Sequence, residues 1–168
     1  MTTIIKEIEI DASKENVWKA LADFGNICHA SPIVLTSHVT SKANKGVGAT
    51  RHCDFSMMGA TGEEKITKWI DGQLVKLEVY ELKKMPGIKT MSAEFEVKPK
   101  GNQSILRGTM QYSMKNGLFD VMNTLMMKKM NDKSWKSVIA GHKKYIETGE
   151  IVTQQTKLEL NKVVDIKN

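Results

Sequence analysis

The feature that most constrains the fold is a long amphipathic segment that follows a series of short alternating segments. Between Gly117 and Gly149, about 31 residues place apolar side chains at i, i+3, i+4 and i+7, the pattern of a helix with one buried face. Such a helix is roughly 45 Å long, comparable to the width of a domain of this size. Its apolar face can be buried only if a sheet curves around it. The positions on this face are Leu118, Val121, Met122, Leu125, Met126, Met130, Trp135, Val138, Ile139, His142 and Ile146.

Seven segments ahead of this helix have the alternating or extended character of β-strands. Short connections with turn-forming residues join most of them, and Asp71-Gly72 is the strongest hairpin signal in the chain. Sequential strands joined by hairpins form an antiparallel meander rather than a parallel sheet. The predicted strands are Thr3–Ile10, Ile33–Ser41, Ala49–Met57, Glu63–Ile70, Gln73–Leu82, Lys89–Lys98 and Gln103–Met114.

Two short helices are predicted between the first and second strands. Ser13 is a suitable N-cap, and Val17, Trp18 and Leu21 follow it at helical spacing. A second short helix or turn is expected at 23–29. The whole pattern predicts an α+β fold, in which a curved seven-stranded antiparallel sheet surrounds a long C-terminal helix.

The chain length is that of one domain, and we expect this domain to span residues 1–148. A chain of 168 residues buries a sizeable core without disulfide or metal support. The remaining tail, 149–168, has neither a two-residue nor a 3.6-residue repeat. It is predicted to be a mobile end, an added helix or a segment that docks on a partner.

Composition narrows the cellular setting. Hydrophobic residues make up 40% of the chain and charged residues 26%, as in ordinary globular proteins. The sequence has neither an apolar run long enough to span a bilayer nor a signal-peptide core near Met1. We therefore expect a cytoplasmic protein without stable membrane insertion, in which Cys28 and Cys53 are free thiols.

The distribution of charge argues against nucleic-acid binding, and the spacing of the histidines argues against a metal site. The net charge of +6 is spread over the second half of the chain without an Arg-rich or aromatic-interleaved stripe, so nucleic-acid binding is not expected. His29, His38, His52 and His142 are scattered without metal-ligand spacing, and neighbouring His52 and Cys53 point to opposite faces of a strand. No metal or other cofactor is predicted, and a monomer or homodimer is expected.

Local motifs resemble the START/Bet v 1-like superfamily, also called helix-grip or SRPBCC, over about residues 3–148. The order of one strand, two short helices, six strands and a long helix is that of this superfamily. The resemblance implies a ligand cavity between sheet and helix, but the superfamily hosts many activities on one architecture. The matching segments are Ile8-Glu9-Ile10-Asp11-Ala12-Ser13-Lys14-Glu15-Asn16-Val17-Trp18-Lys19-Ala20-Leu21-Ala22-Asp23-Phe24, similar to the opening strand and helix, Gly46-Val47-Gly48-Ala49-Thr50-Arg51 at the third strand and Glu64-Lys65-Ile66 in the fourth.

Strand alternation predicts which side chains line such a cavity. Methionine is frequent among them, and its flexible side chain suits a surface that adapts to varied apolar ligands, although it fills ordinary cores equally well. The predicted lining is Arg51, Cys53, Phe55, Met57, Glu64, Leu77, Val79, Glu81, Met91, Phe95, Met110, Tyr112, Leu118, Met122 and Met126.

Arg51, Glu64 and Glu81 are the charged members of this set. A buried charge is costly unless it is paired, so they form a structural ion pair, lie at an exposed rim or anchor a polar group of a ligand. The resemblance also implies that two loops flank the mouth of the cavity, at 58–62 and 83–87.

Three functions remain open from the sequence. The first is a non-catalytic carrier or sensor of a small hydrophobic molecule such as a lipid, polyketide or isoprenoid. The second is a polyketide cyclase- or dehydratase-like enzyme, with Arg51, Glu64, Glu81 and Tyr112 as the candidates for proton transfer. The third is a protein-interaction module that acts through the Met-rich helix or the tail. No catalytic residue can be assigned, and whether the protein is an enzyme is left undecided.

Overall fold

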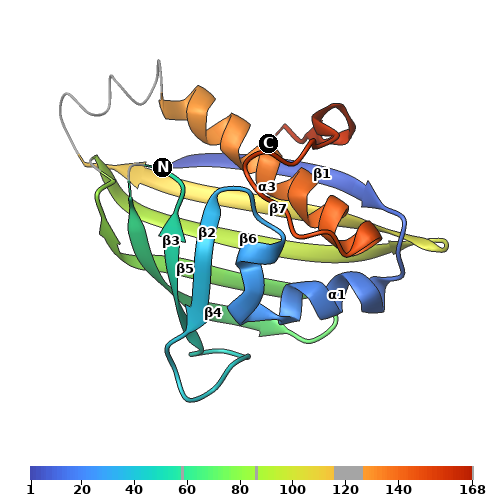
Figure 1. Ribbon diagram of the computed structural model, residues 1–168, viewed down its shortest axis with the longest axis horizontal. Helices are drawn as coiled ribbons and strands as arrows, with labels where there is room; N and C mark the ends of the chain where they lie inside the picture. Colours follow the sequence, from blue (N-terminus) through green and yellow to red (C-terminus); the bar gives the residue numbers. More distant parts are fainter. Residues whose placement is uncertain (58, 86, 116–126, 168) are drawn as a thin grey trace.

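The computed structural model describes residues 1–57, 59–85, 87–115 and 127–167 (Figure 1). It is an α+β structure with a curved antiparallel sheet that is not closed into a barrel, as the helix-grip prediction requires. The strand order is β2-β3-β4-β5-β6-β7-β1-β8, so the seven predicted strands are present and the tail adds an eighth. The strands are β1 (Thr2–Ile10), β2 (Val34–Val39), β3 (Thr50–Phe55), β4 (Thr61–Ile70), β5 (Leu74–Lys83), β6 (Ile88–Lys100), β7 (Gln103–Met114) and β8 (Val164–Asp165).

The first helix has the cap that its sequence predicts. In α1 (Lys14–Ala22), the Ser13 hydroxyl accepts a hydrogen bond from the Asn16 backbone N–H at 3.3 Å. Val17 and Trp18 point from α1 into the core. A short 3-10 helix, η1 (Phe24–His29), follows directly and leads into β2.

The long helix lies across the concave face of the sheet (Figure 1). Its described part, α3 (Lys128–Thr148), ends at Gly149, which has φ 71° and donates its N–H to the Tyr145 carbonyl at 2.8 Å. This is the left-handed glycine cap that commonly ends helices. The predicted start of the helix near Leu118 lies outside the described residues.

A glycine on β7 allows α3 to lie close to the sheet. A Cβ at Gly108 would be 2.3 Å from Ile139 Cδ1 and 2.9 Å from Trp135 Cζ2, which is closer than packed atoms approach. The Trp135 indole N–H donates to the Gly108 carbonyl at 3.1 Å. Because Gly108 has no side chain, Ile139 and Trp135 of the helix can pack directly against β7.

The tail packs on its own domain. The Val152 N–H donates to the His29 carbonyl at 2.9 Å, and the Val152 and Val163 side chains are buried. Beyond η3 (Leu160–Lys162), β8 pairs antiparallel with β1. Of the three expectations for the tail, this arrangement is closest to docking, although the surface that it docks on belongs to the same chain.

A buried lysine joins the tail, the sheet and the helix. Lys6 of β1 is only 1% exposed, and its ammonium group contacts Asp132 of α3 and Asp165 of β8. Burial opposes the charged form of this lysine, but the hydrogen bonds from its ammonium group to the two carboxylates prevail and raise the pKa of Lys6. The lysine that interrupts the apolar alternation of β1 is thus placed against two carboxylates.

Candidate functional site: an apolar cavity

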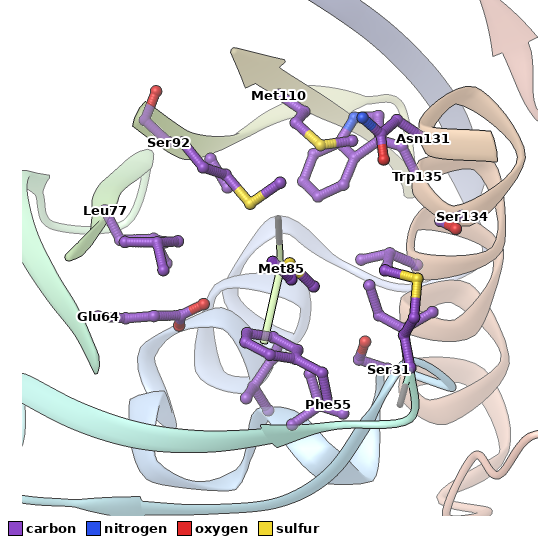
Figure 2. A pocket seen from close by; sticks show the side chains of 18 of the residues that line it. Ser31, Phe55, Glu64, Leu77, Met85, Ser92, Met110, Asn131, Ser134 and Trp135 are labelled. Atoms are coloured by element: carbon purple, nitrogen blue, oxygen red, sulfur yellow. The ribbon is translucent and has the colours of Figure 1, made fainter. Parts of the chain in front are cut away.

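A cavity of about 150 Å³ lies between the concave face of the sheet and α3 (Figure 2). A dry apolar cavity of about this size accommodates benzene, whereas drug-sized ligands occupy roughly 300 Å³ or more. The cavity among the described residues therefore fits a compact molecule or one end of a longer molecule. Of the predicted lining, the structure brings together Arg51, Phe55, Met57, Glu64, Leu77, Val79, Met91, Phe95 and Met110.

Two predicted lining residues are buried elsewhere in the core. Cys53 packs in a small cluster with Val34 and Ala60, and burial raises the pKa of its thiol, so the unreactive protonated form is favoured. Tyr112 is fully buried in the main core. Both residues are buried, as alternation predicts, but neither is among the residues that line the cavity.

The prediction that Glu81 faces the interior is wrong. The pairing of β4 with β5 shifts between Thr61 and Glu63, where β5 contains one extra residue. Glu81 has φ 49° and an exposed side chain, and Leu82 takes the inward position. A bulge of this kind reverses the alternation on which the prediction rested. The predicted lining residues Leu118, Met122 and Met126 lie outside the described part of the chain.

Most of the other lining residues were missed because they lie outside the predicted strand faces, whereas Ala93 shares the predicted face of Met91 and Phe95. Trp135 and Val138 belong to the apolar face of the helix, and Asn131 precedes Trp135 by four residues, so helical spacing could have identified all three. Residues around η1 and the start of β2 gave no comparable signal, because their position depends on how the loop folds over the sheet. The missed residues are Ile27, Ser31, Ile33, Val34, Ser56, Met85, Ile88, Ser92, Ala93, Asn131, Ser134, Trp135 and Val138.

Arg51 and Glu64 form a buried ion pair at the cavity wall. They are direct cross-strand partners on β3 and β4, with 4% and 6% of their surface exposed, and Arg51 Nε donates to Glu64 Oε2 at 2.6 Å. Arg51 also donates to the Phe24 carbonyl at 2.5 Å, and its guanidinium carbon lies 4.2 Å from the centroid of the Phe24 ring. The hydrogen bonds of Arg51 thus go to the protein itself.

One polar group in the cavity wall lacks such a partner. Asn131 of α3 is 6% exposed, and its side-chain Nδ2 is buried without a hydrogen-bond acceptor among the described residues. Figure 2 shows Asn131 beside Trp135 on the helix, with Glu64 on the opposite side of the cavity. An unpaired buried amide donor is uncommon in folded proteins, because its desolvation is uncompensated.

The two predicted mouth loops lie next to each other. Met57 and Met85, one from each loop region, both line the cavity, and a Cβ at Gly59 would be 3.7 Å from Lys84 Nζ. Thr61 and Gly62 belong to β4 instead of the loop, while Met58 and Pro86 lie outside the described residues. That the loops act as a gate stays a prediction.

The chain matches the model of the family described as "Polyketide cyclase / dehydrase and lipid transport" over residues 1–147. The chain belongs to this family. The match and the solved structures together support the START/Bet v 1-like resemblance. A search of the curated proteins finds no relative that matches the sequence.

Solved structures share the family's fold at low sequence identity. A START superfamily protein from Mycobacterium smegmatis has a TM-score of 0.71 and 13% identity, with 86% of this chain and 97% of that one covered. TTHA0849 from Thermus thermophilus has a TM-score of 0.72 and 16% identity over the same shares, 86% and 97%. Ara h 8.0201 has a TM-score of 0.67 and 12% identity, again with 86% and 97% covered. At these identities the likeness establishes the architecture of this family member only.

Two further findings concern the parts of this family member that the structure describes. In those parts, no group of three or more His, Cys, Asp or Glu side chains is arranged to hold a metal ion. The helices described there include none that is both long and apolar enough to cross a membrane.

Proposed function

We propose that the protein binds a small hydrophobic molecule in the cavity between its sheet and α3. The observation that supports this most directly is the cavity itself, whose wall is mainly apolar and includes four flexible methionines. Unfilled apolar space costs stability, because the lining atoms lose packing contacts that a ligand would restore. The lining methionines are Met57, Met85, Met91 and Met110.

Binding is favoured over catalysis by the state of the candidate catalytic residues. Arg51 and Glu64 are paired with each other, Glu81 is exposed, and Tyr112 is buried in the core and is not among the lining residues. General acid–base catalysis needs a titratable group within hydrogen-bond reach of the substrate. The geometry therefore supports a carrier or sensor of a lipid-, polyketide- or isoprenoid-like molecule better than a cyclase or dehydratase.

Methionine methyl NMR with toluene as the probe tests the proposal. In protein labelled with 13C at the methionine methyls, toluene should shift the signals of Met85, Met91 and Met110 through its ring current. The buried methyl of Met114, which belongs to the core, is the internal control. Equal shifts at all methionines, or none, would contradict binding in the cavity.

A matched pair of leucine substitutions locates the binding site. Ala93 lines the cavity on β6, so Ala93→Leu should fill part of the space and weaken toluene binding at least tenfold. Glu94→Leu introduces the same side chain at the next position of the strand, on the opposite face of the sheet. If the two variants lose toluene affinity equally, the ligand does not occupy the cavity.

Native mass spectrometry of protein purified from its own host addresses the natural ligand. A co-purifying apolar molecule that is absent from the Ala93→Leu variant is the expected result. A uniform protein mass in both proteins, together with the absence of toluene binding, would overturn the proposed function.

A further inference from the structure

We propose that Asn131 donates a hydrogen bond to an uncharged oxygen of the ligand, such as a ketone or ester carbonyl. This inference rests on the proposed function and adds the chemical class of the ligand, an apolar molecule with one accepting oxygen. Its basis is the Nδ2 of Asn131, unpaired among the described residues, in the wall of the cavity.

The Asn131 side chain forms part of the cavity wall, so a bound molecule would pack against it. Asn131 is in the described first turn of α3, one helical turn before Trp135, and both side chains line the cavity. The Trp135 N–H is already bonded to the Gly108 carbonyl at 3.1 Å, so the indole offers its apolar face to a ligand. The Asn131 amide therefore offers a donor beside an apolar surface.

The charges of the cavity wall argue for a neutral ligand. Arg51 is the cationic side chain of the described lining, and it is engaged by Glu64 and by the Phe24 carbonyl. A carboxylate in the cavity would be close to Glu64 without a free cation in the described wall to balance it, and burying an unpaired charge is costly. A carbonyl oxygen satisfies the amide donor without this cost.

The size of the cavity suits a ligand that has one accepting oxygen and one ring or short chain. The cavity of about 150 Å³ accommodates a molecule of about the size of a substituted benzene. Acetophenone and α-methylstyrene are matched probes, since they have nearly the same shape and differ by a carbonyl in place of a methylene group. Benzoate adds the negative charge.

Calorimetric titration with the three probes tests the inference. We expect acetophenone to bind about tenfold more tightly than α-methylstyrene, because only the carbonyl pairs with the amide donor. Benzoate should bind more weakly than acetophenone. In Asn131→Leu, the affinities for acetophenone and α-methylstyrene should come within twofold of each other.

Two further measurements separate recognition from folding. Lys133→Leu places the same new side chain on an exposed position of α3 and should keep the tenfold preference. The Asn131 side-chain amide signals, assigned by their loss in Asn131→Leu, should move further downfield with acetophenone than with α-methylstyrene, because both rings shift nearby signals but only the carbonyl accepts a hydrogen bond. A thermal melt of each variant establishes that it is folded.

The outcomes distinguish the inference from the proposed function. If acetophenone and α-methylstyrene bind the native protein equally, or if the preference persists in Asn131→Leu, the inference is overturned while cavity binding stands. If benzoate binds as tightly as acetophenone, the preference for an uncharged oxygen is overturned. If neither neutral probe nor toluene binds, the proposed function falls together with the inference.

Discussion

The buried pair of Arg51 and Glu64 shows how single residues limit the chemistry of this cavity. Each charge is removed from water, and the pair is tolerated because cross-strand register and the Phe24 carbonyl satisfy the hydrogen bonds of Arg51. The same contacts occupy the residues that would otherwise move protons. We therefore interpret the pair as a structural element in the wall of the cavity.

Removing one member of this pair should destabilise the protein far more than removing both. Arg51→Met leaves Glu64 as an unpaired buried charge, so the free energy of unfolding should fall by about 3–5 kcal/mol. The double variant Arg51→Met/Glu64→Leu should return to within about 1–2 kcal/mol of the native protein. Urea unfolding of the two single variants and the double variant measures the coupling, and additive losses would contradict it.

His142 should make the protein sensitive to mild acid. Burial lowers the pKa of His142 to about 4, although a contact of 2.8 Å between its Nδ1 and the Val138 carbonyl opposes the shift. Since the unfolded side chain titrates near 6.5, the unfolded state binds the proton first. Above pH 6.5, His142 makes its full contribution to the free energy of unfolding. As pH falls to 4, this free energy should decrease by about 3 kcal/mol.

Unfolding curves at several pH values test this expectation. His142→Leu should remove most of the dependence between pH 6.5 and 4, because leucine does not titrate. A variant with the same slope as the native protein would show that another group is responsible.

At the scale of elements, the contact between α3 and β7 depends on one absent side chain. Gly108→Ala would place a methyl group 2.3 Å from Ile139 Cδ1, so the Ile139 side chain or the helix itself would have to shift. The free energy of unfolding should fall by about 3 kcal/mol, and the cavity should change shape. Chemical denaturation and the methionine methyl spectrum measure the two effects.

Gly72→Ala is the comparison for this substitution. Gly72 has φ 71°, and a Cβ there meets nothing within 4 Å, so only backbone strain of roughly 1–2 kcal/mol should result. If Gly108→Ala is no more destabilising than Gly72→Ala and leaves the methionine spectrum unchanged, the close packing of α3 on β7 determines neither the stability nor the shape of the cavity.

The elements were largely predictable from sequence, because each has a local signal. Alternation identified the strands, Ser13 the start of α1 and Gly149 the end of α3. The failures have non-local causes. The bulge at Glu81 is set by pairing with β4, and the places of Ile27 and Ile33 in the cavity wall depend on how the segment around η1 folds over the sheet.

At the scale of the whole molecule, Lys6 connects three parts that are distant in sequence. A hydrogen bond from Lys6 lowers the pKa of Asp165, and the pKa of Lys6 itself is raised. Asp165 therefore contributes to the free energy of unfolding above pH 3.8, which is its ordinary pKa. This contribution is lost as pH falls below that value. The tail should separate from β1 in acid, while Lys6 remains charged.

The Ile166 amide reports this separation, because it donates to the Ile5 carbonyl at 3.1 Å. In an NMR titration below about pH 4, its signal should move toward the unfolded position before that of Ile8 in the same sheet. Asp165→Asn should show no such step. Simultaneous loss of both signals would indicate global unfolding instead.

The pairing of β8 with β1 also has a consequence for self-association. In the strand order, β1 becomes the edge strand of the sheet if β8 is removed. β8 pairs with Lys6 and Glu7 of β1. A chain cleaved after Gly149 would present the unpaired amides and carbonyls of β1 to other molecules, and such exposed margins template aggregation. The tail thus covers backbone groups of β1 that would otherwise be available for pairing with another chain.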